Sequence, residues 1–213
     1  GLTLGKLAAV VGNTGVGKTT LVEGLCRDSD FVCATEEHEG RPFLELFTQD
    51  HQKYALANQL DYLLRRADQE INIRQGEKPG IQDGGLDQDF QVFTRLFFQK
   101  GYLLRSEFEI CERLYNIIRT FLPPPDLYIL LRAPSEVVAG RFERRNRRLS
   151  IAQIEDMGTI EKLLENWFAS VEPEKLLIVD SDHEDSSYSH SVAEMVSILD
   201  SLEREATKPG LPD

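Results

Sequence analysis

The clearest chemical pattern lies at 12–19, where GNTGVGKT matches the phosphate-binding pattern G-x-x-x-x-G-K-[ST]. An apolar run precedes this segment and a helical pattern follows it, which is the context that such a loop requires. Glycines let backbone N–H groups turn toward phosphate oxygens, and the positive end of the following helix faces the same anion. Lys18 is expected to reach the outer phosphates and Thr19 to bind Mg²⁺.

The loop and the start of the helix supply the predicted ATP-binding residues. They are Gly12, Asn13, Thr14, Gly15, Val16, Gly17, Lys18, Thr19 and Thr20, although Thr20 is more simply a packing or capping residue. The alternative is a glycine-rich turn from strand to helix that binds no ligand.

A phosphate-binding loop does not identify the reaction, because GTPases, ATPases and small-molecule kinases share it. The sequence has neither the Asn-Lys-x-Asp guanine reader nor the Asp-x-x-Gly switch of a GTPase. Motor ATPases usually hold magnesium with a carboxylate that ends an apolar strand. Here the predicted strand at 127–132 ends in Arg132, whereas the one at 78–83 ends in Asp83. The sequence therefore favours a small-molecule kinase that uses ATP.

A dense cluster of arginines lies at 141–148 (RFERRNRR), in a protein that is otherwise acidic. Guanidinium groups on a mobile lid can stabilise the charge of a transferring phosphoryl group and exclude water. Four of them are spaced three and four residues apart and would share one helix face: Arg141, Arg144, Arg145 and Arg148. The alternative is a solvated helix face paired with nearby acids.

Two further groups of residues could serve the acceptor. Glu36 and Glu37 follow a predicted strand, where a carboxylate is well placed to act as a base toward an acceptor hydroxyl. Gln59 and Arg66 are seven residues apart on a long helical pattern, so they face the same way, with Tyr62 between them. An amide and a guanidinium beside an aromatic ring can read a nucleobase edge. A charged strand end and ordinary helix surface are the alternatives.

Together these features resemble the deoxyribonucleoside kinase family, P-loop enzymes that move the γ-phosphate of ATP to the 5′-hydroxyl of a deoxynucleoside. The resemblance covers nearly the whole chain and depends on the order and spacing of GNTGVGKTT at 12–20, EEHEGRPFLELF at 36–47, KYALANQLDYLLRR at 53–66, DGGLDQDFQVF at 83–93, Pro-Asp-Leu before the strand at 127–132, and RFERRNR at 141–147. It implies that Glu37 is the general base. It also implies a base-reading group of Gln59, Arg66 and Asp89, and lid arginines at Arg141, Arg145 and Arg147.

Three positions depart from the family pattern. The family usually has Glu-Arg-Ser after the third strand, where the acid helps to hold magnesium and the arginine touches the 5′ region. This chain has Asp83-Gly84-Gly85, which keeps an acid for the metal and lacks the arginine. Thr48 replaces a tyrosine that meets the sugar 3′-hydroxyl, and Leu149-Ser150 replaces an acid after the lid arginines. These changes leave open a different acceptor or a weaker enzyme that recruits other residues.

The first interpretation is an ATP- and Mg²⁺-dependent kinase of deoxynucleosides in nucleotide salvage, with Glu37 as base and Glu36 as the second candidate. A kinase of a nucleoside monophosphate or of another small hydroxyl acceptor is one alternative. Arg41 or Arg74 could supply its extra positive charge, although each is expected at the surface. A nucleotide-sensing module without turnover is the other alternative. The resemblance also implies that a deoxynucleoside triphosphate could bind backwards as a feedback inhibitor.

Composition narrows the range of partners. The 213 residues include 24 Lys and Arg against 36 Asp and Glu, which gives a formal charge of -12. This charge argues against non-specific electrostatic binding to a nucleic acid polymer or an anionic membrane. No apolar run approaches the roughly 18 residues of a membrane helix, and no signal-peptide pattern opens the chain, so a cytoplasmic protein is expected. The three cysteines are expected to be small buried residues and not a disulfide framework.

Alternating apolar runs and helical patterns predict an α/β fold, a parallel sheet with helices on both faces, and the resemblance implies the three-layer P-loop kinase type. Strands are predicted at 6–12, 31–35, 78–83, 127–132 and 175–180, each buried on both sides. Helices are predicted at 17–28, 43–73 with a break near Asp50, 89–101, 106–121, 135–146, 151–170 and 189–205. We expect one domain over 1–205, with a lid at about 134–150 and a flexible tail at 206–213. The apolar excess at 89–121 fits either a homodimer contact or ordinary core packing.

Overall fold

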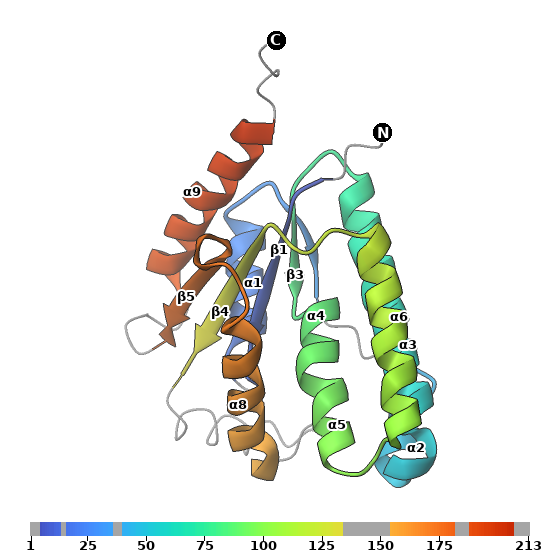
Figure 1. The fold of residues 1–213 in the computed structure, drawn as a ribbon. Coiled ribbons are helices and arrows are strands. Elements are labelled where there is room, and N and C mark those ends of the chain that lie inside the picture. Colours follow the sequence, from blue (N-terminus) through green and yellow to red (C-terminus); the bar gives the residue numbers. More distant parts are fainter. Residues whose placement is uncertain (1–4, 14–15, 36–39, 134–153, 182–187, 207–213) are drawn as a thin grey trace.

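The computed structural model describes residues 5–13, 16–35, 40–133, 154–181 and 188–206, the last five of these by their backbone alone. Its centre is a sheet of five parallel strands in the order β2-β3-β1-β4-β5 (Figure 1). The strands are β1 (Leu7–Gly12), β2 (Val32–Ala34), β3 (Gly80–Asp83), β4 (Leu127–Arg132) and β5 (Leu176–Asp180). The predicted parallel α/β fold is confirmed, and each strand lies within its predicted range.

The edge strands are less buried than predicted. Val32 in β2 is 42% exposed and Ile178 in β5 is 45% exposed, whereas all six residues of β1 are buried. An edge strand has a neighbour on one side only, and the helices do not cover its outer flank. The prediction that every strand is buried on both sides is therefore wrong for these two.

Most helices lie where periodicity predicts them. They are α1 (Lys18–Arg27), α2 (Leu44–Gln49), α3 (His51–Gln75), α4 (Leu86–Gln88), a π-helical turn (Asp89–Thr94), α5 (Arg95–Gln99), α6 (Arg105–Phe121), α8 (Met157–Phe168) and α9 (Ser189–Ala206), with 3₁₀ turns at Ile154–Asp156 and Pro173–Lys175. Asp50 separates α2 from α3 because its carboxylate accepts a hydrogen bond from the N–H of Lys53, 3.1 Å away. The helix predicted from residue 89 starts earlier, at Leu86, and the one predicted at 151–170 is shorter, with its α-helix at Met157–Phe168. The helix predicted at 135–146 lies outside the described residues.

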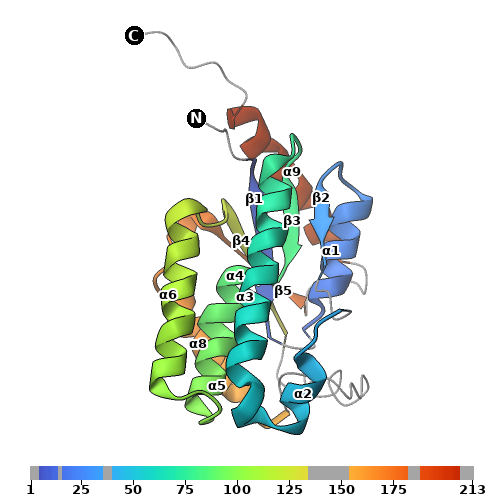
Figure 2. The ribbon, with the colours of Figure 1, turned by 90° about the vertical axis from the view of Figure 1, so that its right-hand side faces the viewer.

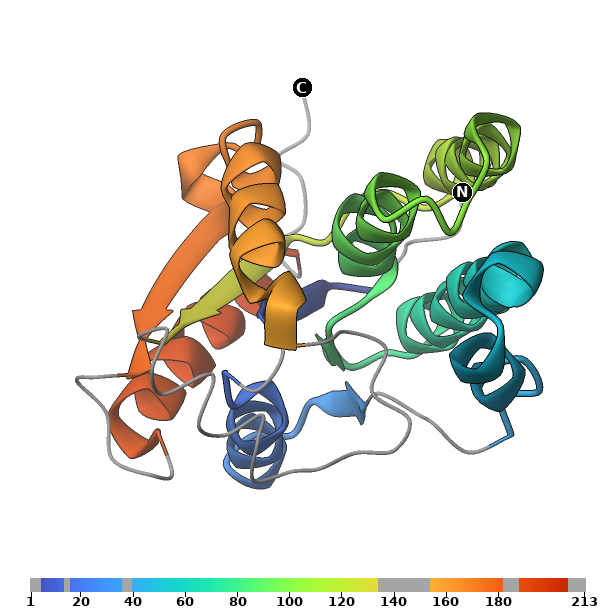
Figure 3. The same ribbon diagram turned by 90° about the horizontal axis from the view of Figure 1, so that it is seen from below.

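Two helical layers enclose the sheet (Figure 3). On one face, α1 and α9 pack against alternate residues of β1, so Ala8 and Val10 share a core with Leu25 and Met195. On the other face, Ala9 and Val11 pack with residues of α8, including Trp167, and of the α4–α5 segment. Helix α3 packs against β1 and β3 on this same face, and α6 lies beside α3 (Figure 2). The alternation along β1 thus builds two cores from one strand.

The cysteines divide into two kinds. Cys26 in α1 and Cys33 in β2 form a disulfide with their Cα atoms 6.1 Å apart, so the expectation of separate buried thiols is wrong for this pair. Cys111 in α6 is a buried free thiol, as predicted. Burial raises the pKa of Cys111 to about 11, which keeps the thiol neutral and unreactive at ordinary pH.

A buried ionic cluster ties α3, α4 and α6 together. The Arg119 guanidinium contacts Glu70 at 2.8 Å and Asp87 at 2.8 Å, and Glu70 also pairs with Arg74 at 3.0 Å. The hydroxyl of Tyr128 donates to Asp87 at 2.9 Å. Burial and the negative charge of Asp87 raise the pKa of Tyr128 far above its usual value, so this hydroxyl remains a donor.

We predict that Arg119→Met destabilises the fold by about 3 kcal/mol, because it leaves two buried carboxylates without their shared cation. Urea unfolding at neutral pH would measure the loss. Arg113→Met is the matched control, since Arg113 is exposed on the same helix and its replacement should change stability by less than about 0.5 kcal/mol. Equal effects of the two substitutions would contradict a stabilising role for the cluster.

Candidate functional site

The phosphate-binding loop lies between β1 and α1, at the carboxyl end of the central strand. Here the chain order of neighbouring strands reverses, with β3 on one side of β1 and β4 on the other, and ligands of open α/β sheets bind at such points. Gly12 is required because a Cβ there would lie 2.5 Å from the carbonyl oxygen of Leu131. Gly17 caps α1 with a φ of 105°, which favours glycine. Thr14 and Gly15 lie outside the described residues.

The lysine of the loop folds back over it. The Lys18 ammonium donates to the carbonyl oxygens of Gly12 and Asn13, each 3.0 Å away. The ammonium is thereby held at the mouth of the loop, where the outer phosphates of a nucleotide would lie. Val16 is buried under the loop, and Thr20 is half-buried in the first turn of α1, consistent with packing.

The loop is also tied to α8 across the sheet. The Asn13 side-chain amide donates to the Glu161 carboxylate at 2.8 Å and to the Met157 carbonyl oxygen at 3.1 Å. Asn13 is 2% exposed. Sequence reasoning missed this connection because Glu161 is far away in the chain and belongs to no recognisable motif.

Thr19 and Asp83 form a pair of oxygen ligands suited to magnesium. The Thr19 hydroxyl donates to Asp83 Oδ2 at 3.1 Å, and Asp83 is 2% exposed at the end of β3. Mg²⁺ prefers hard oxygen ligands and is usually held by one or two protein groups together with substrate phosphates and water. In the described part of the chain, no group of three or more His, Cys, Asp or Glu side chains could enclose a metal ion. The pair thus fits a magnesium ion that arrives with a nucleotide.

The structure brings the predicted acceptor residues together. Arg66 Nε donates to Asp89 Oδ2 at 3.1 Å, and the Gln59 amide donates to the Thr94 hydroxyl at 2.8 Å. Thr94 in turn donates to the backbone carbonyl of Asp89 at 3.0 Å, across the π-helical turn. All four residues are at most 3% exposed. Sequence reasoning missed Thr94, because the extra residue of the π turn changes which side chains face inward.

Gly84 places the acceptor cluster, which is Gln59, Arg66, Asp89 and Thr94, next to the proposed metal pair, which is Thr19 and Asp83. It follows Asp83 directly and has a φ of 76°, and a Cβ there would lie 3.0 Å from Arg66 Nη2. The guanidinium therefore approaches the backbone at the end of β3. On the other side, the Gln88 amide oxygen accepts from the N–H of Gly12 at 3.0 Å. The phosphate end and the acceptor end of the site thus share the segment that follows β3.

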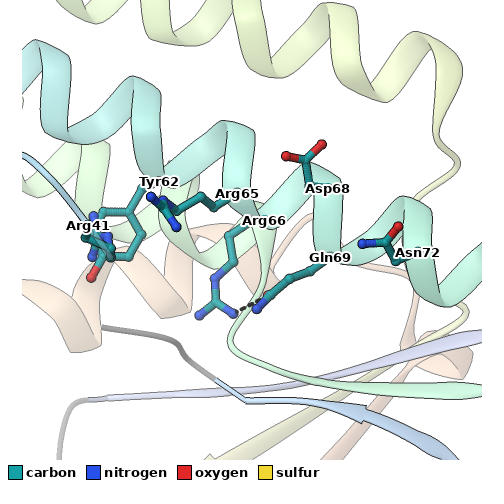
Figure 4. A pocket seen from close by; sticks show the side chains of 7 residues that line it. All are labelled: Arg41, Tyr62, Arg65, Arg66, Asp68, Gln69 and Asn72. Carbon is teal, nitrogen blue, oxygen red and sulfur yellow. Dashed lines mark hydrogen bonds between the residues drawn. The ribbon is translucent and has the colours of Figure 1, made fainter. Parts of the chain in front are cut away.

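A cavity of about 240 Å³ opens beside Arg66 along α3 (Figure 4). Arg41, Tyr62, Arg65, Arg66, Asp68, Gln69 and Asn72 line it. The expectation that Arg41 and Arg74 are surface residues is wrong, since each is at most 7% exposed. Arg74 lies near the amino ends of β1 and β4, far from the loop, where it donates to the carbonyl oxygens of Gly5 and Pro123. Only Arg41 of the two is placed to meet an acceptor.

Several predicted residues lie outside the described ranges. They are the two candidate bases, Glu36 and Glu37, and the lid segment at 134–150 with Arg141, Arg145 and Arg147. Thr48 is described, and its hydroxyl donates to the carbonyl oxygen of Glu45 at 2.7 Å, within its own helix.

Comparison with known families and relatives gives a consistent result. Residues 8–201 match the model of the deoxynucleoside kinase family. Deoxyadenosine/deoxycytidine kinase from Bacillus subtilis (strain 168) is 26% identical over 205 residues, covering 91% of this chain and 93% of the relative. Deoxyadenosine kinase from Dictyostelium discoideum is 26% identical and covers 88% and 83% of the two chains. Deoxyguanosine kinase from Bacillus subtilis (strain 168) is 23% identical and covers 83% and 87%.

Solved structures with the same fold include deoxyadenosine kinase from M. mycoides. The structure with bound dCTP aligns with this chain at a TM-score of 0.76 and 19% sequence identity. The alignment covers 90% of this chain and 99% of that one. The structure with bound dATP aligns with this chain at a TM-score of 0.75 and 20% sequence identity, covering 91% of this chain and 98% of that one.

We predict that Asp83→Asn weakens binding of ATP at least about tenfold in the presence of Mg²⁺, because the loss of one ligand charge costs more than about 1.4 kcal/mol. Without Mg²⁺ the same substitution should not weaken ATP binding. Titration with a fluorescent ATP analogue, with and without Mg²⁺, would measure both affinities. Asp180→Asn is the control, because Asp180 ends β5 in a half-exposed pair with Arg132. An equal loss in both conditions would rule out a magnesium role for Asp83.

Proposed function

The chain belongs to the deoxynucleoside kinase family and is therefore a phosphotransferase that acts on deoxynucleosides, and we propose that ATP donates the γ-phosphate to the 5′-hydroxyl of its acceptor. The observation that carries this proposal is the meeting of two sites at the ends of β1 and β3. Lys18, Thr19 and Asp83 form the phosphate and metal end. The buried pair of Arg66 and Asp89 begins the acceptor end.

This arrangement supports catalysis by positioning and by charge. Backbone N–H groups of the loop and the ammonium of Lys18 would hold the phosphates of ATP. A magnesium ion held by Thr19 and Asp83 would supply positive charge to the phosphate oxygens. The Arg66–Asp89 pair would fix the acceptor so that its hydroxyl faces the donor, which removes much of the entropic cost of the reaction.

We propose Glu37 as the base that takes the proton of the acceptor hydroxyl, with Glu36 as the other candidate. Both come shortly after β2, which lies beside β3 in the sheet and runs toward the same edge as the strand that ends in Asp83. Arg141, Arg145 and Arg147 are proposed to stabilise the charge of the transferring group from the lid.

Two copies of the chain are proposed to pair through an apolar stripe on α6. Ile110, Ile117 and Phe121 share one face of this helix and are 45%, 55% and 77% exposed. Leu64 on the adjacent α3 is 51% exposed. By contrast, Leu96, Phe97 and Leu103, from the same apolar segment, are buried in the core. Core packing therefore accounts for the buried residues of that segment, and the homodimer contact is proposed for the exposed ones.

None of the described helices has the length and apolar character needed to cross a membrane. A cytoplasmic location and the absence of nucleic acid polymers among the partners remain predictions from composition.

We predict turnover with ATP and Mg²⁺ on at least one of the four deoxynucleosides, in a panel that also holds ribonucleosides and nucleoside monophosphates. Replacing the true base by glutamine should lower kcat about 10²–10⁴-fold. Glu36→Gln and Glu37→Gln, measured side by side, would identify it, and unchanged ATP affinity would show that the donor site is intact. Binding of ATP without turnover on any member of the panel would favour the sensor alternative.

Feedback by a deoxynucleoside triphosphate is proposed because a relative of the same fold is known with dCTP and with dATP bound. A triphosphate bound backwards would place its nucleoside on Arg66 and its phosphates on the loop. Arg66→Gln should then weaken its binding about tenfold or more, through the loss of a buried charged hydrogen bond, and leave ATP binding unchanged. Competition against a fluorescent ATP analogue would measure both affinities. Unchanged triphosphate affinity would mean that it binds as a donor.

A further inference from the structure

Gln88 is a buried amide at the junction between the phosphate end and the acceptor end of the site. It is 4% exposed and ends α4, directly before Asp89. Its side-chain oxygen accepts from the backbone N–H of Gly12 at 3.0 Å. Burial of an amide is costly unless its donors and acceptors are used, so both ends of this side chain bear on what the site binds.

The contact with Gly12 fixes which way the amide of Gln88 faces. A backbone N–H can only donate, so the amide oxygen is the atom beside it and the N–H₂ group is directed to the other side. The nitrogen of that group, Nε2, lies 3.4 Å from the point where a Cβ of Gly84 would stand. It donates to no residue in the described part of the chain. Gln88 therefore presents two N–H donors beside the backbone that follows β3.

A second donor group comes to the same place. Arg66 Nη2 lies 3.0 Å from the same Cβ point of Gly84. Neither nitrogen can accept a hydrogen bond from the other, so the atom that suits the space beside Gly84 is a ligand oxygen. Asp89 and Gln69 already accept from Arg66. The amide of Gln88 is therefore the donor that such an oxygen would engage.

The order of groups along the site indicates which oxygen this is. The loop that begins at Gly12 is proposed to hold the phosphates, and Arg66 with Asp89 belongs to the predicted base-reading group. In a deoxynucleoside the 5′-hydroxyl lies between the base and the incoming phosphate. Gln88 is bonded to the loop and is the chain neighbour of Asp89, so its N–H₂ group is placed to meet the 5′-oxygen of the acceptor.

A donor at the 5′-oxygen would support the reaction by orientation and by charge. A hydroxyl oxygen has two lone pairs, so one can attack the γ-phosphorus while the other accepts from the amide. The new O–P bond forms as the bond from phosphorus to the leaving ADP oxygen breaks, and the proton of the hydroxyl passes to the base. The amide neither gains nor loses a proton. Its hydrogen bond strengthens as negative charge grows on the attacking oxygen.

We propose that Gln88 is a catalytic residue whose amide N–H₂ donates to the 5′-oxygen of the acceptor, while its amide oxygen holds the first glycine of the phosphate loop. The proposal rests on the deoxynucleoside kinase function above and deepens it, because it names the group that orients the attacking oxygen. The contact with Gly12 joins that orientation to the donor loop.

The first test is turnover by Gln88→Met, which keeps the length of the side chain and removes its hydrogen bonds. With ATP, Mg²⁺ and the deoxynucleoside that the unmodified protein turns over fastest, kcat should fall about 10–100-fold, because the lost bond is strongest in the transition state. The KM of the deoxynucleoside should change less than about fivefold. Unchanged kcat would overturn the proposal.

Gln91→Met is the matched control. It makes the same chemical change three residues farther along, where the amide oxygen of half-buried Gln91 accepts from Arg95 Nε at 3.1 Å and not from the loop. Its kcat should stay within about twofold of that of the unmodified protein.

Equilibrium binding without nucleotide separates donation to the 5′-oxygen from support of the loop. The unmodified protein should bind the deoxynucleoside at least about tenfold more tightly than its analogue without the 5′-hydroxyl, and Gln88→Met should shrink this ratio at least about threefold. Gln91→Met should leave the ratio unchanged. If the ratio is unchanged in Gln88→Met and only the affinity for ATP falls, Gln88 supports the loop alone and the proposal is overturned.

If thermal unfolding shows that Gln88→Met does not fold, Gln88→Glu decides the question by the same binding ratio, measured at about pH 8 where the carboxyl is ionised. The carboxylate keeps an oxygen for the N–H of Gly12 and has no N–H for the 5′-oxygen, so the ratio should shrink as well. A ratio equal to that of the unmodified protein would overturn the proposal. Absence of turnover by the unmodified protein on every deoxynucleoside is a separate outcome, which rejects the proposed function itself.

Discussion

The parallel pairing of β1 with β3 is the constraint on which the rest of the site depends. It sets Val10 opposite Asp83, so the loop that follows β1 and the acid that ends β3 emerge at the same edge of the sheet. The 3.1 Å contact between Thr19 and Asp83 is a consequence of this register. A slip of one residue would turn Asp83 to the other face of the sheet and separate the two proposed metal ligands.

A second requirement is the burial of charge beside this edge. Arg66 and Asp89 are almost completely buried, and such a pair is retained only where its geometry is well satisfied. Gln69, Thr94 and the glycine after Asp83 complete its surroundings, since Arg66 also donates to Gln69 at 2.9 Å. The same helix carries Glu70 of the ionic cluster on another face. Helix α3 is therefore held by buried ion pairs on two faces, through Glu70 in the ionic cluster and through Arg66 in the candidate site.

Much of this arrangement could be predicted from the sequence because the signals are local. Apolar runs predicted the five strands, and the spacing of glycines and Lys18 predicted the phosphate loop. Burial of Arg41 could not be predicted, because Glu-Gly-Arg-Pro is a polar stretch and the side chains that cover Arg41 come from α3. The π turn at 89–94 and the disulfide between Cys26 and Cys33 were missed for the same reason. Each depends on neighbours that only the folded chain brings together.

The two hydrogen bonds from Asn13 to α8 have a mechanical consequence. Residues 134–153, which include the arginine cluster, end just before the 3₁₀ turn that leads into α8. The start of α8 is fastened to the phosphate loop through Met157 and Glu161. A displacement of Asn13 would therefore have to break these two hydrogen bonds or move the first turn of α8 with it. The loop that is proposed to bind phosphate is thus also an attachment point for the first turn of α8.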